Sequence, residues 1–260
     1  MSKKVNQKFK KEGEVKIYGT NACLAVFNKR PNDIIQLFLT KEKLKTLSNI
    51  TKFCASKKIA YHIVERSELD DMTKATHHEE VCMLVRKSLT RSLEQFLQTK
   101  PQKCLLIALE NVSNPHNIGA IVRSAAHFGV TGLVVPDAKL AHTAAAVRTS
   151  EGGSEYVEIF EAADFKKTLL TLKKNGFTLI TTSSHAKKSL YELEWPAKSV
   201  LIFGEEGPGL SKDTLSLGEA IKIPGTDHVE SLNVSVATAV ILSDYYQKEK
   251  MHALSNSRFK

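Results

Sequence analysis

The sequence lacks several features that mark membrane-bound, secreted or metal-binding proteins. No apolar stretch among its 260 residues reaches the roughly 18 residues of a spanning helix. The basic first residues carry no apolar segment, so we expect no secretory signal there. The four cysteines form no Cys-x-x-Cys pair, and His77-His78 has no partners at a metal-ligand spacing. We therefore expect a cytoplasmic protein with buried or idle thiols, no metal, no membrane partner and a surface turn at residues 77–78.

The common phosphate-binding glycine patterns are also missing. The chain contains neither Gly-x-x-x-x-Gly-Lys nor Gly-x-Gly-x-x-Gly, which argues against a nucleotide-dependent enzyme of the doubly wound type. It has no internal repeat and no low-complexity segment. With 42% apolar and 25% charged residues, the composition is that of an ordinary globular protein with room for two modest domains.

The excess of positive charge is confined to the first hundred residues. Residues 1–100 contain 20 Lys and Arg against 11 Asp and Glu, a net charge of +9, whereas residues 101–260 contain 17 of each sign. A polyanion would meet the first part, because phosphate contacts supply affinity that is independent of sequence. Lysine-rich surfaces also keep proteins soluble, and the basic residues 1–12 fit either a solvated tail or a flexible arm that touches phosphate.

The order of apolar patterns predicts two α/β domains. Strand patterns at 34–39, 60–64 and 81–85 alternate with helical patterns over 23–27 and 41–57, which indicates a small domain over residues 13–88. The polar residues 89–102 contain Pro101 and are expected to form a linker with at least one helical turn. Residues 103–260 form the second, larger domain.

The second domain is expected to contain a parallel sheet. Near-continuous apolar runs, typical of strands covered on both faces, lie at 104–109, 132–135, 177–182, 200–203 and 220–223. Helical patterns lie at 118–128, 162–174 and 234–247, and Phe165, Leu169 and Leu172 are spaced for one helix face. This alternation predicts a doubly wound sheet with ligands at the carboxyl ends of its strands.

Three short polar or glycine-rich stretches follow such strands, and we expect them to form one site. They are residues 114–119 with Arg123 further along the same helix, residues 204–209, and residues 223–225 running into 231–233. Asn114 or Asn117 suits an N-cap, and Ser231 is the N-cap candidate of the last helix. Arg123 lies among apolar and small residues, so it needs an anion, either Glu206 or a phosphate or ribose of a ligand. The two glutamates of the second stretch would repel a free phosphate and tolerate a cationic ligand.

Together, the three stretches resemble the signature motifs of the SpoU, or TrmH-like, RNA ribose methyltransferases of the SPOUT superfamily. Tyr18-Gly-Thr-Asn-Ala and the basic segment after it are similar to the family's N-terminal substrate-binding domain, which resembles a ribosomal RNA-binding protein. The resemblance implies a C-terminal α/β trefoil-knot domain with S-adenosylmethionine bent in the knot, although knots are rare in proteins. It also implies a homodimer with the site at the subunit interface.

The resemblance assigns roles to individual residues. The catalytic residues would be Asn117, Arg123, Glu206, Ser231 and Asn233, and the cofactor would lie on the backbone of Gly204, Ile223 and Leu232. The implied reaction is methyl transfer to a ribose 2′-hydroxyl of RNA, with guanosine in ribosomal RNA favoured. A tRNA methyltransferase, or a non-catalytic RNA-binding or ribosome-assembly protein with the same fold, is the alternative. Gly225 departs from the methionine of many relatives, which leaves the affinity for the cofactor open.

Overall fold

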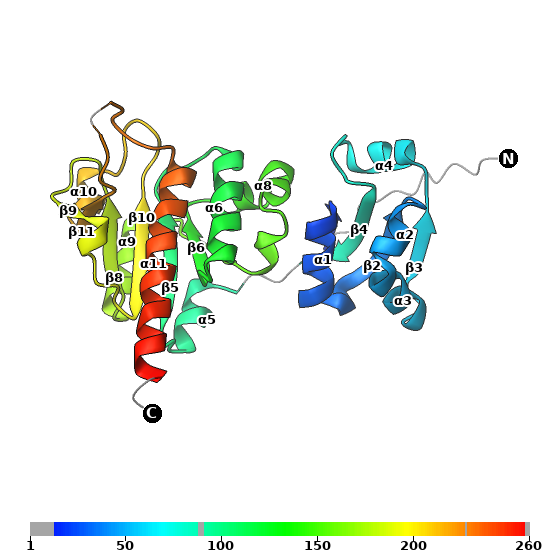
Figure 1. Cartoon of the computed structure of the whole chain (residues 1–260), viewed down its shortest axis with the longest axis horizontal. Helices are drawn as coiled ribbons and strands as arrows, with labels where there is room; N and C mark the ends of the chain where they lie inside the picture. Colours follow the sequence, from blue (N-terminus) through cyan, green and yellow to red (C-terminus); the bar gives the residue numbers. More distant parts are fainter. Residues whose placement is uncertain (1–12, 88–90, 227, 258–260) are drawn as a thin grey trace. The chain divides into compact units, whose positions relative to one another are not determined.

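The computed structural model describes residues 13–87, 91–226 and 228–257, with residues 250–257 described by their backbone alone. The chain divides into two compact units between residues 89 and 90 (Figure 1). Each unit contains one β-sheet, which confirms the predicted α/β class. Within the described ranges, every helix is too short or too polar to cross a membrane.

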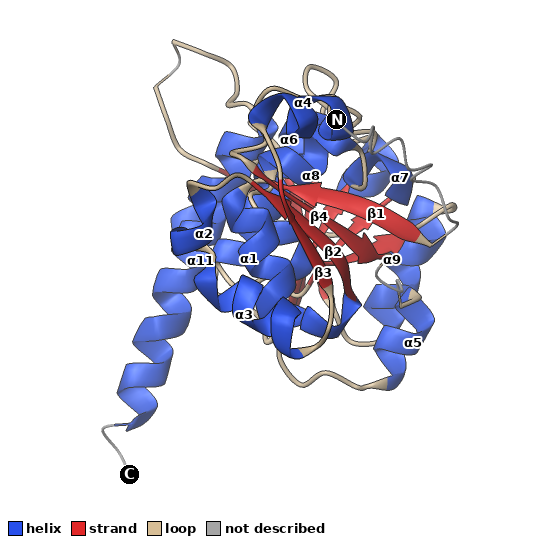
Figure 2. Ribbon diagram, turned by 90° about the vertical axis from the view of Figure 1, so that its right-hand side faces the viewer, coloured by secondary structure: helices blue, strands red, loops and turns tan. Residues whose placement is uncertain are grey.

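The first unit contains a mixed sheet with the strand order β1-β4-β2-β3 (Figure 2). Its strands are β1 (Glu14–Tyr18), β2 (Ile34–Leu39), β3 (Ala60–Ile63) and β4 (Val81–Arg86). β4 runs antiparallel to β1 and β2, whereas β2 and β3 are parallel. The helices are α1 (Thr20–Lys29), η1 (Pro31–Asp33), α2 (Lys43–Thr46), α3 (Ser48–Ser56) and α4 (Arg66–Thr73). The predicted strands near 34–39, 60–64 and 81–85 are therefore confirmed.

Two expectations for the first unit were wrong in detail. The helical pattern over 41–57 forms two helices, because the chain bends at Leu47, whose side chain is only 1% exposed. The turn predicted at residues 77–78 is present and His77 is exposed, but the His78 side chain is fully buried. Its Nε2 lies 3.0 Å from Asp70 Oδ1, and its Nδ1 accepts a hydrogen bond from the Glu80 backbone at 2.9 Å. With both ring nitrogens bonded, the imidazole anchors the loop before β4.

The cysteines lie in the apolar interior as free thiols. All four cysteines are free and buried, as predicted. Burial raises the pKa of the Cys82 thiol to about 12, because the apolar interior disfavours the thiolate. In the part of the chain that the structure describes, no three His, Cys, Asp or Glu side chains come close enough together to hold a metal ion.

The second unit is built on a seven-stranded sheet with the order β7-β6-β5-β10-β8-β11-β9 and parallel pairing throughout. The strands are β5 (Cys104–Leu109), β6 (Gly132–Val135), β7 (Glu158–Glu161), β8 (Thr178–Thr182), β9 (Lys188–Ser189), β10 (Lys198–Phe203) and β11 (Glu219–Lys222). All five predicted strands are present. β7 and β9 were not predicted, because β7 has charged residues at both ends and β9 is only two residues long.

Helices cover both faces of this sheet and explain its apolar strands (Figure 1). Along β5, Leu105, Ile107 and Leu109 belong to one core cluster with residues of α6 (Pro115–His127) and α11 (Val234–Ser257). Leu106 and Ala108 belong to the other cluster, with residues of α5 (Leu93–Gln98) and α9 (Phe165–Lys174). Leu169 and Leu172 of α9 are fully buried, so the predicted helix face is confirmed. The remaining helices are α7 (Ala138–Ala141), α8 (Ala144–Thr149), η2 (Gly153–Glu155), η3 (Leu190–Glu192) and α10 (Lys212–Leu215).

Candidate functional site

The three stretches singled out in the sequence meet at the carboxyl edge of the second sheet. Residues 114–119 follow β5, residues 204–209 follow β10, and residues 223–233 follow β11. β5 and β10 are neighbours that pair at Leu109 and Phe203, and β8 alone separates β10 from β11. Because all these strands are parallel, their carboxyl ends lie at one edge, where open α/β sheets bind ligands.

One side chain from each stretch takes part in a shared hydrogen-bond network. Asn117 Nδ2 donates to Glu206 Oε1 at 2.9 Å, and Asn233 Nδ2 donates to the same oxygen at 2.5 Å. Asn233 Nδ2 also lies 3.2 Å from Asn117 Oδ1, to which it donates. Two amides thus share one carboxylate oxygen, a charge-assisted arrangement that fixes the three loops relative to one another.

The start of α6 shows how Asn117 becomes available for this network. Asn114 is the N-cap, because its side-chain oxygen accepts a hydrogen bond from the His116 N–H at 2.9 Å, and Pro115 follows at the first helical position. Asn117 lies in the first turn, is 9% exposed and does not cap the helix. Of the two candidate N-caps in the sequence, Asn114 therefore caps α6, and Asn117 bonds to Glu206 in the site.

The start of α11 corrects one expectation. Ser231 was expected to cap this helix, but α11 begins at Val234, so the preceding residue is Asn233. Asn233 Oδ1 accepts hydrogen bonds from the Ser235 N–H at 2.9 Å and from Ser235 Oγ at 2.6 Å. Asn233 therefore caps the helix with its oxygen and contacts Glu206 with its nitrogen. Ser231 is exposed two residues earlier and has no hydrogen-bond partner among the described residues.

The glycine-rich stretch forms a tight hairpin. Glu205 and Gly209 form an antiparallel bridge, and the Gly209 N–H donates to Glu205 O at 2.9 Å. A Cβ at Gly204 would overlap the backbone of Gly209 and Leu210, so only glycine fits there. Gly207 and Gly209 have φ values of 89° and 71°, which other residues rarely adopt. The three glycines therefore permit a backbone conformation that other residues would strain.

Arg123 takes no part in the hydrogen-bond network of Asn117, Glu206 and Asn233. It lies six positions beyond Asn117 on α6, so it projects from another side of the helix, and it is exposed. The expectation of an arginine buried among apolar residues was wrong, because its neighbours Val122 and Ala125 take the buried positions of α6. Within the described ranges, Arg123 pairs neither with Glu206 nor with any other carboxylate. Its guanidinium is available to an anion from outside the chain.

Apolar side chains beside the network are also exposed. Leu232 is 45% exposed, and Val229 and Val236, on either side of it, are exposed too. Ile223 packs in part against the core, whereas Gly225 lies in open space with nothing within 4 Å of the position that a Cβ would occupy. The site therefore combines a polar centre with an apolar, solvent-facing rim.

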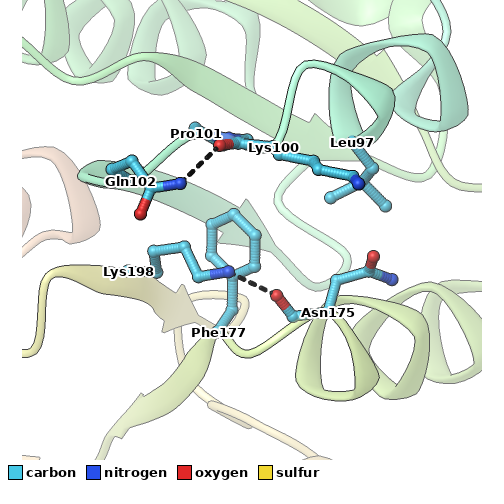
Figure 3. Close-up of a pocket in the computed structure, with 7 residues that line it drawn as sticks. All are labelled: Leu97, Lys100, Pro101, Gln102, Asn175, Phe177 and Lys198. Atoms are coloured by element: carbon cyan, nitrogen blue, oxygen red, sulfur yellow. Dashed lines mark hydrogen bonds between the residues drawn. The ribbon is translucent and has the colours of Figure 1, made fainter.

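The second unit also has an open hollow of about 220 Å³, which belongs to the opposite edge of the sheet. Figure 3 shows Lys100, from the loop before β5, and Lys198 among the seven lining residues, with the Phe177 ring beside the Lys198 side chain. Lys198 Nζ donates to Asn175 O at 2.5 Å and lies 5.2 Å from the centre of the Phe177 ring. Because Lys198 is the first residue of β10, this hollow is a strand length away from the Asn117–Glu206–Asn233 network.

Comparisons with known proteins agree with this geometry. Residues 104–243 match the SpoU rRNA Methylase family, and residues 16–91 match the RNA 2'-O ribose methyltransferase substrate binding domain. An uncharacterized tRNA/rRNA methyltransferase of Escherichia coli, YfiF, is 39% identical over 91% of this chain and 69% of its own length. The 23S rRNA (guanosine-2'-O-)-methyltransferase RlmB of Pseudomonas aeruginosa is 32% identical over 87% of this chain and 94% of its own.

A similar fold is found in the SpoU methyltransferase AviRb of Streptomyces viridochromogenes, solved in complex with AdoMet. The TM-score is 0.71 at 19% identity, and 92% of each chain is covered. The matches of both domains in sequence, together with the identity to YfiF, confirm the resemblance drawn from the three stretches. The chain belongs to the SpoU rRNA methylase family of RNA 2′-O-ribose methyltransferases.

Proposed function

We propose that this protein transfers the methyl group of S-adenosylmethionine to a ribose 2′-hydroxyl of ribosomal RNA, with guanosine as the favoured nucleoside. The observation that carries the proposal is the network of Asn117, Glu206 and Asn233, which joins the three motif loops at the ligand-binding edge of the sheet. The guanosine and the ribosomal RNA rest on the similarity to RlmB, which covers both units.

The cofactor would lie on the backbone of Gly204, Ile223 and Leu232, next to the network. The hairpin carries the exposed carboxylates of Glu205 and Glu206 and so favours a ligand with a positive charge, such as a sulfonium. The knotted path that the family implies would thread α11 past the hairpin and bend the cofactor between these loops. The four buried free thiols favour a reducing compartment, the cytoplasm.

In the reaction, the ribose 2′-oxygen attacks the methyl carbon, the carbon–sulfur bond breaks, and the hydroxyl proton leaves. Alignment of the two reactants supplies much of the barrier lowering, and the residues of the network orient nucleoside and cofactor. Ser231 is exposed two residues before Asn233 and would contact the nucleoside. Arginine stays protonated near neutral pH, so Arg123 would hold a phosphate while the proton passes to that phosphate or to water.

A homodimer would complete the site. Arg123 is exposed and takes no part in the network of its own chain, while Leu232 and Val236 expose apolar surface beside the network. Pairing of two chains over this surface would cover the apolar rim and bring an arginine of one chain toward the cofactor of the other. Sedimentation of the purified protein would test this arrangement, and a monomer at micromolar concentration would contradict it.

Two other functions are tested by simple measurements. A non-catalytic RNA-binding protein would not bind S-adenosylmethionine, whereas the intact network predicts binding that calorimetry can detect.

A tRNA methyltransferase would act on tRNA, and such relatives often lack the N-terminal domain that is present here. Mapping 2′-O-methyl positions in total RNA with and without the gene decides between the substrates. We expect one site to be lost from large-subunit ribosomal RNA, and a loss confined to tRNA would refute that choice.

A further inference from the structure

A second carboxylate, that of Glu110 at the end of β5, binds the segment that follows the hairpin. Glu110 follows β5 directly, and its backbone N–H donates to Phe203 O at 2.8 Å. Its carboxylate accepts hydrogen bonds from the Ser211 N–H at 2.8 Å and from Ser211 Oγ at 3.0 Å. It also accepts one from Thr214 Oγ1 at 2.6 Å. One half-buried side chain thus collects three donors from the segment that leaves the hairpin.

These donors belong to the residues that end the hairpin. Ser211 is the N-cap of α10, and its hydroxyl accepts a hydrogen bond from the Thr214 N–H at 3.2 Å. Leu210, just before it, is 7% exposed and belongs to the core. The segment 210–214 is therefore fixed to the sheet by an apolar contact and to the end of β5 by Glu110.

The hairpin is thus held at two points by carboxylates from different places in the chain. Glu206, near the tip, bonds to Asn117 and Asn233, and Glu110 holds the base. A single backbone hydrogen bond, from the Gly209 N–H to Glu205 O, crosses the hairpin within the described part of the chain. The glycines at positions 204, 207 and 209 permit this conformation but give the backbone little stiffness, so the two anchors help to hold it.

We propose that Glu110 is a positioning residue that keeps the hairpin over residues 204–211 in the conformation that binds the cofactor. The proposal rests on the function proposed above and adds a residue outside the assigned set. Glu110 acts through Ser211 and Thr214 and not by contact with the network: its carboxylate oxygens bind residues 211 and 214, whereas Glu206 binds residues 117 and 233.

Two substitutions of Glu110 separate hydrogen bonding from charge. In Glu110→Ala, the Ser211 N–H and the Thr214 hydroxyl lose their acceptor, and the Ser211 hydroxyl keeps only Thr214 Oγ1, 3.0 Å away. In Glu110→Gln, the amide oxygen can still accept from the Ser211 N–H, while the amide nitrogen donates to a hydroxyl that turns to accept. We therefore expect Glu110→Gln to keep most of the function. The matched control is Ser92→Ala, which removes an N-cap from α5 of the same unit, where Ser92 Oγ accepts from the Gln95 N–H at 3.2 Å.

The test combines hydrogen–deuterium exchange with calorimetry of S-adenosylmethionine binding on the full chain. Glu110→Ala should speed amide exchange over residues 204–211 and weaken cofactor binding about tenfold, which corresponds to about 1.4 kcal/mol. Its kcat at saturating cofactor should change less than its KM for the cofactor. Glu110→Gln should restore both readouts to within about threefold, and Ser92→Ala should leave both at the wild-type value.

Each outcome decides the matter. Unchanged exchange in Glu110→Ala, or faster exchange with unchanged cofactor affinity, would overturn the proposal. A loss in Glu110→Gln as large as in Glu110→Ala would also overturn it, because charge and not hydrogen bonding would then be responsible. If the wild-type protein bound no S-adenosylmethionine, the proposed function would fail, whereas the exchange data would still show whether Glu110 holds the hairpin.

Discussion

Asn117 donates a hydrogen bond of 2.9 Å to Glu206, although the two residues are 89 positions apart in the chain. The bond joins the first turn of α6 to the tip of the hairpin after β10. Asn233 donates to the same carboxylate oxygen from the start of α11. The three loops of the site therefore depend on one another through a single side chain.

This dependence predicts the effect of Glu206→Gln. The glutamine oxygen can still accept from both asparagines, but without the negative charge both hydrogen bonds become weaker and the three loops are held less firmly. A misplacement of about 1 Å costs roughly 100-fold in rate, and we expect a loss of methyl transfer of about that size. The measurement is transfer of a tritiated methyl group to RNA. Glu205→Gln is the control, because Glu205 is exposed and its carboxylate lies outside the network, and it should retain most activity.

Arg123→Ala should separate stability from activity. Because Arg123 is exposed and forms no ion pair among the described residues, the melting temperature and cofactor affinity should stay within error of the wild type. Methyl transfer should fall about 100-fold if the guanidinium holds the RNA phosphate at the site. Arg123→Lys keeps the charge without the planar fork and should give an intermediate rate. Undiminished transfer by Arg123→Ala would exclude this residue from the reaction.

Gly204 and Gly225 form a matched pair of glycine positions. A Cβ at Gly204 would overlap the backbone of Gly209 and Leu210, whereas one at Gly225 would meet nothing within 4 Å. Gly204→Ala should therefore distort the hairpin and abolish measurable binding of S-adenosylmethionine. Gly225→Ala and Gly225→Met should leave stability within about 0.5 kcal/mol and bind the cofactor no more weakly than the wild type. Calorimetry and thermal melts check both, and equal effects at the two positions would contradict the geometry of the hairpin.

The buried thiol of Cys82 predicts a stability that falls in alkali. Its pKa is raised from 9.0 to about 12 by desolvation, so the folded state binds its proton more tightly than the unfolded state does. The stabilisation is fully present below pH 9 and is lost as the pH rises toward 12, with about 1.4 kcal/mol lost at pH 10. Urea unfolding at pH 8 and pH 10 should show a smaller decrease in Cys82→Ala than in the wild type. Equal decreases in both proteins would contradict this assignment.

Local patterns in the sequence predicted the elements that carry the site. The apolar runs at 104–109 and 200–203 are strands because helices cover both of their faces, and this burial is visible in composition alone. The N-cap at Asn114 was one of two local options. The assignment of Ser231 as a cap was wrong, because Asn233 is an equally good cap and lies next to the first helical residue.

Contacts between distant segments could not be predicted from local patterns. The sharing of Glu206 by Asn117 and Asn233 depends on the strand order β5-β10-β8-β11, which brings together residues up to 116 positions apart. The role of Glu110 could not be predicted from the sequence. An acidic residue after a strand gives the same local pattern whether it faces water or accepts three hydrogen bonds. The exposure of Arg123 depends on how α6 is rotated against the sheet, which its mixed apolar and small neighbours do not determine.

The most direct test of the account is to incubate the purified protein with ribosomal RNA and S-adenosylmethionine that carries an isotope-labelled methyl group. Digestion of the RNA to nucleosides and mass spectrometry then locate the label. The account predicts the label on the 2′-oxygen of one ribose, with a signal about 100-fold lower for Glu206→Gln and near wild-type for Glu205→Gln. Label on a base, or equal labelling by wild type and Glu206→Gln, would contradict it.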